Sequence, residues 1–140
     1  MRINILLVLL GSVVVIAGVM LVAKPTTLIE DVFISDTSES FIYTIQLSLP
    51  FEYIDHFPKE KTELVQVSLG VNSWFEINAN HYFGSETIVP DILQSQLMTD
   101  IAYEAMVVGE SYLTIRFKQP VNYLLMADEA SKNIVIRVNK

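Results

Sequence analysis

The two histidines are the residues with the widest chemical use, because an imidazole can bind a metal or move a proton. His56 stands in Asp55-His56-Phe57-Pro58, and His81 stands in Asn80-His81-Tyr82-Phe83. Neither has a second histidine at the His-x-His or His-x-x-x-His spacing of metal sites. We therefore predict that each is a loop residue packed beside aromatic side chains, and that the chain binds no metal.

Other kinds of catalysis also lack their usual motifs. No serine stands in Gly-x-Ser-x-Gly, and the five glycines form no phosphate-binding loop. The absence of cysteine excludes disulfides, iron–sulfur clusters and thiolate zinc sites. We expect Asp128-Glu129 to lie in a solvated turn and Glu30-Asp31 to be solvated too. These observations favour a non-enzymatic protein without a cofactor, and an enzyme with an unrecognised site is the alternative.

Aromatic residues in the middle of the chain are better candidates for binding. Trp74-Phe75 and Tyr82-Phe83 lie close together in the sequence, and Trp and Tyr are enriched where proteins contact partners or carbohydrate. The candidate interaction surface is therefore Trp74, His81 and Tyr82. Alternatively, Trp74, Phe75 and Ile77 complete a hydrophobic core.

The start of the chain predicts a membrane anchor. Residues 3–23 read INILLVLLGSVVVIAGVMLVA and carry no charge. As a helix they would span roughly 30 Å, about the thickness of a bilayer's hydrocarbon core. A cleaved signal peptide is the alternative, but its apolar core would be shorter, and Leu21 stands where a small residue is needed. Pro25 predicts that the helix ends at Lys24.

Charge then suggests an orientation. Lys24 is followed by no Lys or Arg until Lys59, so the positive-inside rule places Met1 in the cytoplasm and exports residues 25–140. That part holds seven Lys/Arg and all 16 Asp/Glu, a formal charge of −9. Such a surface repels nucleic acid and anionic lipid. We expect a single-pass protein of the bacterial inner membrane with a periplasmic domain.

The anchor also offers a helix-packing face. Gly11 and Gly18 are seven residues apart and share one side of a helix, where Ser12 and Ala17 accompany them. Small residues allow helices to approach closely in a membrane. Ordinary transmembrane composition explains the same residues equally well.

The remainder of the chain reads as β-structure. Apolar and polar residues alternate with a period of two, which is typical of half-buried strands, in the segments 41–49, 65–71, 75–79, 113–118 and 134–139. One stretch, residues 90–98, has helical spacing, and we predict a short helix there.

An internal repeat organises these strands. When residues 41–53 are set over residues 111–123 without a gap, Thr44, Ile45, Pro50 and Tyr53 meet identical residues. Each copy continues through a polar loop into a closing strand, at 65–69 and at 134–138. The repeat predicts two similar three-stranded units in a small β-sandwich, with a proline at which each ribbon bends from one sheet to the other. Chance similarity of alternating patterns is the alternative.

The pattern apolar-Thr-Ile-x-apolar-x-x-Pro-apolar-x-Tyr, followed by a polar loop and an Ile/Val strand, resembles AMIN domains. The likeness is best at 113–138 and weaker at 41–69, and the insert from residue 72 to about 100 departs from it. AMIN domains are β-sandwich modules of bacterial envelope proteins, and the resemblance implies periplasmic localisation and, for some members, peptidoglycan binding.

Together these observations predict an anchor over residues 1–24 and an exported β-rich domain over 25–140, with repeat units at about 30–71 and 101–140 and an insert at 72–100. We expect an accessory or interaction subunit of an integral membrane protein complex in the bacterial envelope. A peptidoglycan-binding envelope module is the alternative.

Overall fold

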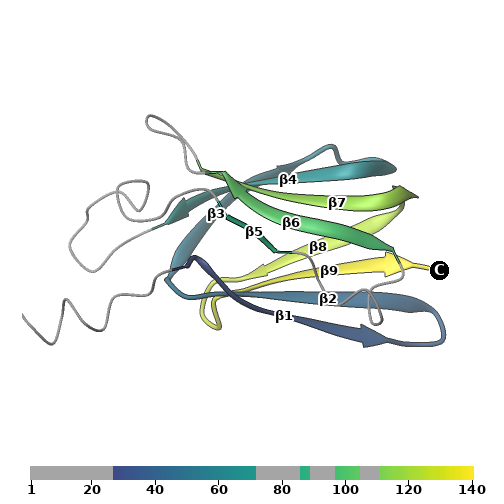
Figure 1. Ribbon diagram of the computed structural model, residues 1–140, viewed down its shortest axis with the longest axis horizontal. Helices are drawn as coiled ribbons and strands as arrows, with labels where there is room; N and C mark the ends of the chain where they lie inside the picture. The colour runs from purple at the N-terminus through teal and green to yellow at the C-terminus, as the bar shows by residue number, and fades with distance from the viewer. Residues whose placement is uncertain (1–26, 72–85, 89–96, 105–110) are drawn as a thin grey trace, which may run out of the picture.

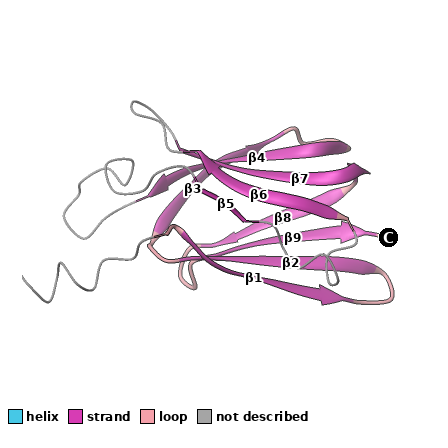
Figure 2. Ribbon diagram, in the orientation of Figure 1, coloured by secondary structure: helices cyan, strands magenta, loops and turns pink. Residues whose placement is uncertain are grey.

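The computed structural model describes residues 27–71, 86–88, 97–104 and 111–140 (Figure 1). Within these ranges the chain forms nine strands: β1 (Ile29–Asp36), β2 (Ser40–Leu47), β3 (Phe51–Phe57), β4 (Thr62–Val71), β5 (Glu86–Ile88), β6 (Met98–Glu104), β7 (Ser111–Val121), β8 (Tyr123–Asp128) and β9 (Asn133–Asn139). The described residues contain no helix, as Figure 2 shows. The predicted mainly-β class is confirmed for them.

The strands form two antiparallel sheets that pack face to face. The four-stranded sheet has the order β1-β2-β9-β8, and the five-stranded sheet has the order β3-β4-β7-β6-β5. In Figure 1 the layer of β4, β7 and β6 lies above the layer of β9, β2 and β1. The architecture is a β-sandwich, in which each sheet buries one face and leaves the other exposed.

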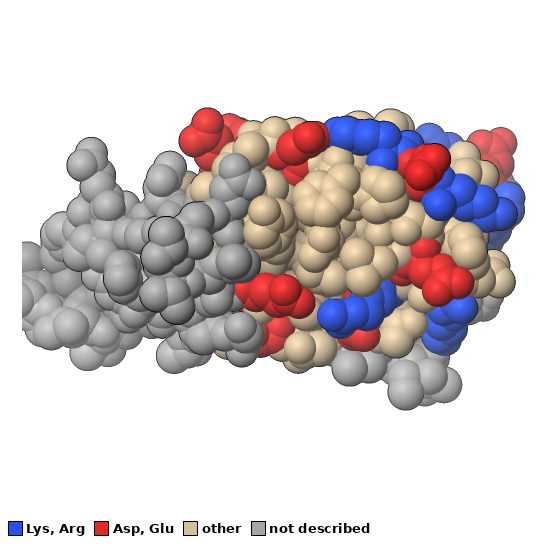
Figure 3. All heavy atoms as spheres, turned by 90° about the horizontal axis from the view of Figure 1, so that it is seen from above, with Lys and Arg blue, Asp and Glu red and all other residues tan. Residues whose placement is uncertain are grey.

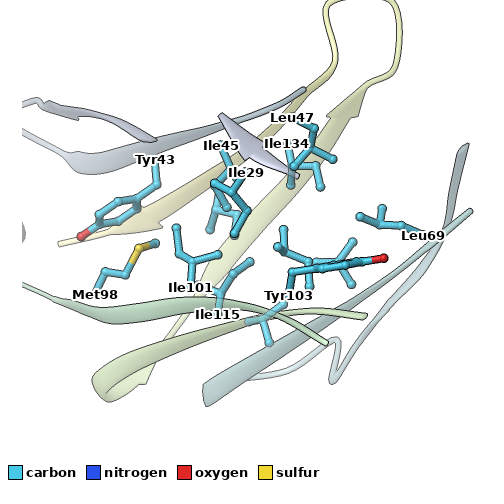
Figure 4. Packing of buried hydrophobic residues seen from close by; sticks show 14 of the residues in the cluster. Ile29, Tyr43, Ile45, Leu47, Leu69, Met98, Ile101, Tyr103, Ile115 and Ile134 are labelled. Carbon is cyan, nitrogen blue, oxygen red and sulfur yellow. The ribbon is translucent and has the colours of Figure 1, made fainter. Parts of the chain in front are cut away.

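The core consists of the inward-facing residues of the alternating segments. Tyr43 of β2 and Phe117 of β7 meet edge-on across the two sheets, with ring centroids 6.3 Å apart. In Figure 4, side chains such as Ile45 and Ile134 face Ile101 and Ile115 of the opposite layer. On strands β2, β4, β7 and β9, the side chains with no exposed surface are Tyr43, Ile45, Leu47, Val65, Val67, Leu113, Ile115, Ile134, Ile136 and Val138. Their β-branched and aromatic types suit a pleated surface that is covered on one side.

The two halves of the chain occupy equivalent places in the pairing pattern. Strands β1 to β4 correspond in order to β6 to β9, but the sheets are exchanged. β1 and β2 lie in the four-stranded sheet with β8 and β9, whereas β6 and β7 lie in the five-stranded sheet with β3 and β4. Each half therefore has four strands, one more than the sequence repeat covers, and β5 is an additional edge strand.

Residue registers agree with this correspondence. Ile45 of β2 lies between Val32 of β1 and Ile134 of β9. Its counterpart seventy positions on, Ile115 of β7, lies between Ile101 of β6 and Val65 of β4. Val32 and Ile101 are 69 positions apart in the sequence, and so are Val65 and Ile134, so the neighbours of the two isoleucines also correspond.

The aligned prolines mark the places where the chain changes sheet. Pro50 separates β2 of the four-stranded sheet from β3 of the five-stranded sheet. Pro120 stands next to the end of β7, and only Asn122 separates β7 from β8 of the other sheet. Proline cannot donate to a ladder, so it is tolerated where pairing with one sheet ends. The ribbon bends at both positions where the sequence repeat places a proline.

One sequence prediction is corrected by the structure, and another lies mostly outside the described residues. His56 and Phe57 belong to β3 and not to a loop, because β3 pairs with β4 as far as Phe57. Most of the predicted helix at 90–98 lies outside the described residues, and its last two residues form a bend at Leu97 and the start of β6 at Met98. The described ranges contain no helix long and apolar enough to cross a bilayer, and the predicted anchor precedes them.

Candidate functional site

The site residues predicted from the sequence lie outside the described ranges. Trp74, His81 and Tyr82 fall in the segment 72–85, and Gly11 and Gly18 fall in the segment 1–26. Their proposed roles in interaction and helix packing therefore stay predictions. The described residues supply a different candidate surface, on the outer face of the four-stranded sheet.

An apolar strip crosses this outer face from one edge strand to the other. It consists of Phe33 of β1, Ile42 of β2, Val135 of β9, and Leu124 and Met126 of β8. Three of these side chains are strongly exposed, with 52% for Phe33, 57% for Leu124 and 52% for Met126. Ile42 and Val135 are half-buried between them.

The ladder registers place these residues side by side. In one row across the sheet, Phe33 pairs with Thr44, Thr44 with Val135, and Val135 with Met126. In the next row, Ile42 pairs with Arg137, which pairs with Leu124. Thr44 and Arg137 stand within these rows, but Ile42 is a diagonal neighbour of both Phe33 and Val135, so apolar contact still runs from β1 to β8. Continuous exposed apolar patches mark interaction sites in proteins that are otherwise soluble.

The rim of the strip is mostly acidic. Asp31 of β1 and Asp128 of β8 flank one end, where they pair with Gln46 and Asn133 respectively. At the other end Arg137 lies 3.8 Å from the Glu39 carboxylate. The strip therefore suits a partner whose own contact surface is apolar in the centre and basic around it.

The outer face of the five-stranded sheet differs in character. Figure 3 views the molecule from the side of β4 and β7 and shows acidic and basic side chains around an uncharged central area. Arg116 of β7 bonds the Asp100 carboxylate at 2.5 Å, and its guanidinium lies 3.9 Å from the Glu104 carboxylate. Phe57 and Tyr112 meet edge-on at 6.2 Å. Phe57 and Leu64 are exposed on this face as well, with 43% and 38%, but less than the three strongly exposed side chains of the apolar strip, so the strip is the stronger candidate.

A second cluster joins the edges of the two sheets, where β3 and β8 meet. The ring of His56 lies 5.7 Å from the ring of Tyr123, and its Nδ1 lies 2.5 Å from the Tyr53 hydroxyl oxygen. The Tyr123 hydroxyl donates to the Pro58 carbonyl. Glu129 accepts a hydrogen bond of 2.8 Å from the Tyr53 backbone N–H. The two tyrosines that the repeat aligns thus enclose one histidine.

Protonation of His56 is disfavoured in this cluster. Partial burial lowers the pKa of His56, and the Lys59 ammonium, 3.5 Å from Nδ1, lowers it further, although the Asp55 carboxylate opposes this. Because an ammonium can only donate, Nδ1 is an acceptor and the Tyr53 hydroxyl donates to it. Lys59 in turn bonds Asp55 at 2.5 Å and lowers the pKa of that carboxyl. The arrangement holds the two sheet edges together, and this is a structural role for His56.

Comparison with protein-family models, with curated proteins and with solved structures finds no match to this chain. The AMIN-like resemblance therefore stays a prediction. The described residues contain no group of three or more His, Asp or Glu side chains able to hold a metal.

The sequence carried a signal for the apolar strip. Residues 124–127 read Leu-Leu-Met-Ala, without the polar alternation of the other strands. An uninterrupted apolar run in a strand predicts that both of its faces contact other groups. Phe33 likewise stands in a short apolar run, Val32-Phe33-Ile34, and only the sheet order shows that it continues the strip.

Proposed function

We propose that the protein is a non-enzymatic accessory subunit of a membrane protein complex in the bacterial envelope, which works by contact through its β-sandwich. The observation that carries this proposal is the apolar strip. Three strongly exposed side chains from the two edge strands of one sheet are costly to leave in water, since each CH₂ that is buried gains about 0.8 kcal/mol. A partner that covers the strip recovers this free energy.

The partner we propose is an integral membrane protein of the same complex. Residues 3–23 are the uncharged stretch that would hold the chain in the inner membrane, with the N-terminus in the cytoplasm and residues 25–140 in the periplasm. The sandwich begins only five residues after Lys24, at Ile29, so a partner rising from the same membrane is within reach. The acidic rim favours basic residues around the partner's apolar contact surface.

The test uses the full chain purified from membranes in mild detergent. Variants Phe33→Lys and Met126→Lys place a charge in the strip, whereas the matched control Thr87→Lys places it on exposed β5 of the other sheet. We expect the native chain and the control to retain a stoichiometric membrane partner and both strip variants to lose it. A photo-crosslinker at Leu124, but not at Thr87, should capture the same partner.

Two outcomes would count against the proposal. A partner retained equally by the strip variants and the control would show that the strip is not the contact surface. Retention of the purified chain on peptidoglycan sacculi, without any membrane partner, would support the alternative of a peptidoglycan-binding envelope module.

A further inference from the structure

A hollow of about 590 Å³ opens at the end of the sandwich where β7 bends into β8. It lies beside the C-terminal end of β9, and β1 begins at the opposite end of the molecule (Figure 1). The lining residues come from the end of β1, the start of β2, the residues just before β4 and β6, and the ends of β7 and β9: Asp36, Phe41, Lys61, Leu97, Gln119, Pro120, Val121, Asn122, Asn139 and Lys140.

Among the described side chains that line the hollow, two are lysines and one is a carboxylate. Lys140 is held by Asp36, with which it forms an ion pair, and its ammonium lies 4.5 Å from the centre of the Phe41 ring. The pair contributes no net charge. Among the described lining residues Lys61 is the other one with a charged side chain, and it is exposed. Lys61 therefore presents a positive charge at the hollow in a chain whose formal charge is −7.

Three carboxamides accompany this positive charge. Gln119, Asn122 and Asn139 each offer both hydrogen-bond donors and an acceptor. Apolar surface from Leu97 and Pro120 adjoins them. Pockets of this composition fix a ligand's orientation with a few polar groups while apolar walls bury its hydrocarbon parts.

The equivalent place in the first half of the chain has a different composition. At the offsets found for the repeat, Gln119 and Asn122 correspond to Leu49 and Glu52, and Asn139 corresponds to Gly70. No such trio of amides faces the Pro50 bend in the described residues. The polar lining is therefore not a requirement of the bend itself, because the same bend forms without it.

We propose that this hollow binds a short peptide segment that ends in a free α-carboxylate. Lys61 attracts the carboxylate, the carboxamides bond the peptide's own amide groups, and Leu97 and Pro120 contact an apolar side chain. The three carboxamides favour a peptide over a simple anion, because peptide groups can bond both their N–H donors and their acceptor oxygens. This inference goes beyond the proposed function, since the hollow and the apolar strip are separate surfaces.

The probe is N-acetyl-leucyl-alanine, added to the isotope-labelled full chain in detergent micelles. Backbone amide shifts of Lys61, Asn122 and Asn139 report on binding. We expect a dissociation constant of about 1 mM, the range for a ligand of this size. The C-terminal amide of the same peptide should bind about tenfold more weakly, because it lacks the charge. Sodium acetate should produce much smaller shifts.

Substitutions taken from the other end of the molecule provide the structural test. Asn122→Glu and Gln119→Leu introduce the residues found at the equivalent positions, and the fold tolerates them because Gln119 and Asn122 are themselves exposed. We expect Asn122→Glu to weaken peptide binding at least tenfold and Lys61→Met to weaken it about tenfold. Lys59→Met is the matched control, because Lys59 lies in the same loop but pairs with Asp55, and it should leave binding unchanged.

The proposal is overturned by any of three results. These are equal affinity for the acid and its amide, acetate shifts as large as those of the peptide, or no shift with 20 mM peptide, roughly twentyfold above the expected dissociation constant. Each result leaves the membrane-partner proposal intact, because that proposal depends on Phe33 and Met126. Conversely, loss of the partner contact would not alter peptide binding.

Discussion

The two bends of the sandwich share a backbone geometry but differ in what surrounds them. Next to Pro50, the Ser48 N–H donates to the Leu28 carbonyl at 2.8 Å, and next to Pro120 the Lys118 N–H donates to the Leu97 carbonyl at the same distance. Leu28 is fully buried, whereas Leu97 is half-buried at the margin of the hollow. One bend is sealed by its leucine and the other is open.

The two bends show which positions the fold constrains and which it leaves variable. The inward positions keep apolar residues in both halves, because the core must be filled whichever sheet a strand joins. At the open bend, by contrast, Gln119 and Asn122 face solvent and contribute little to stability, so these residues are free to serve binding. In a protein built from two equivalent halves, function is therefore best sought where equivalent positions carry different chemistry.

The largest test of this comparison concerns the core. Ile45→Ala and Ile115→Ala remove equivalent side chains that are both 0% exposed. We expect each to lower the free energy of unfolding by about 3 kcal/mol, from lost burial and from the cavity left behind. Denaturant unfolding of the full chain in micelles, followed by Trp74 fluorescence and circular dichroism, measures both. A loss confined to one variant would mean that the halves do not share one core.

The two leucines at the bends should differ in their contribution. Leu28→Ala removes a fully buried side chain, and we expect a loss of about 2–3 kcal/mol in the free energy of unfolding. Leu97→Ala removes a half-buried one, with an expected loss of about 1 kcal/mol. The same unfolding measurements apply. Equal losses of unfolding free energy in the two variants would mean that both leucines seal their bends to the same extent.

Much of this fold was predictable from the alternating residues. The period of two in residues 41–47 and 113–117 identifies both strands and their buried sides, and the aligned prolines locate the changes of sheet. The alignment omits β1 and β6, because residues 29–36 and 98–104 share spacing but few identities. Their pairing depends on contacts distant in the sequence, which a local pattern does not record.

The candidate sites were less predictable. The apolar strip requires the order of four strands before Phe33 and Met126 become neighbours. The hollow likewise combines Lys61, Asn122 and Asn139 from three hairpin ends. Individually these are ordinary surface residues, and no spacing in the sequence relates them. His56 was expected beside aromatic residues, and it is, but both of its tyrosine partners come from the repeat and meet only where the sheet edges join.

The junction between β3 and β8 adds a dependence on pH. The pKa of His56 is lowered below its usual 6.5, first by burial and then by Lys59. The unfolded chain therefore binds a proton more readily, so stability is full above about pH 6.5 and is lost as pH falls through the lowered pKa. We expect unfolding free energy to fall between pH 7 and pH 5 in the native chain.

His56→Asn removes the titrating group and should flatten this part of the curve. The lowered pKa of Asp55 acts in a separate, more acidic range, below about pH 4, so it does not obscure the result. Tyr53→Phe retains the imidazole and serves as the control, in which the dependence between pH 7 and pH 5 persists. An unchanged slope in His56→Asn would assign that dependence to other groups.

The smallest effect on stability is expected at the open bend itself, where Asp36→Asn breaks the ion pair with Lys140. The two side chains are 52% and 34% exposed, and a pair exposed to this extent contributes under about 1 kcal/mol, less in high salt.

Asp36→Asn should also change peptide binding in the hollow, because the Lys140 charge is then no longer neutralised. Binding of N-acetyl-leucyl-alanine should tighten about threefold at low salt, since a gain of this size corresponds to an exposed ionic contact. At the sealed bend, Lys132→Met removes a lysine whose ammonium contacts the Ser48 carbonyl at 3.4 Å, and peptide binding should not change. If both variants alter peptide affinity equally, the positive charge of the whole surface, and not the open bend, attracts the carboxylate.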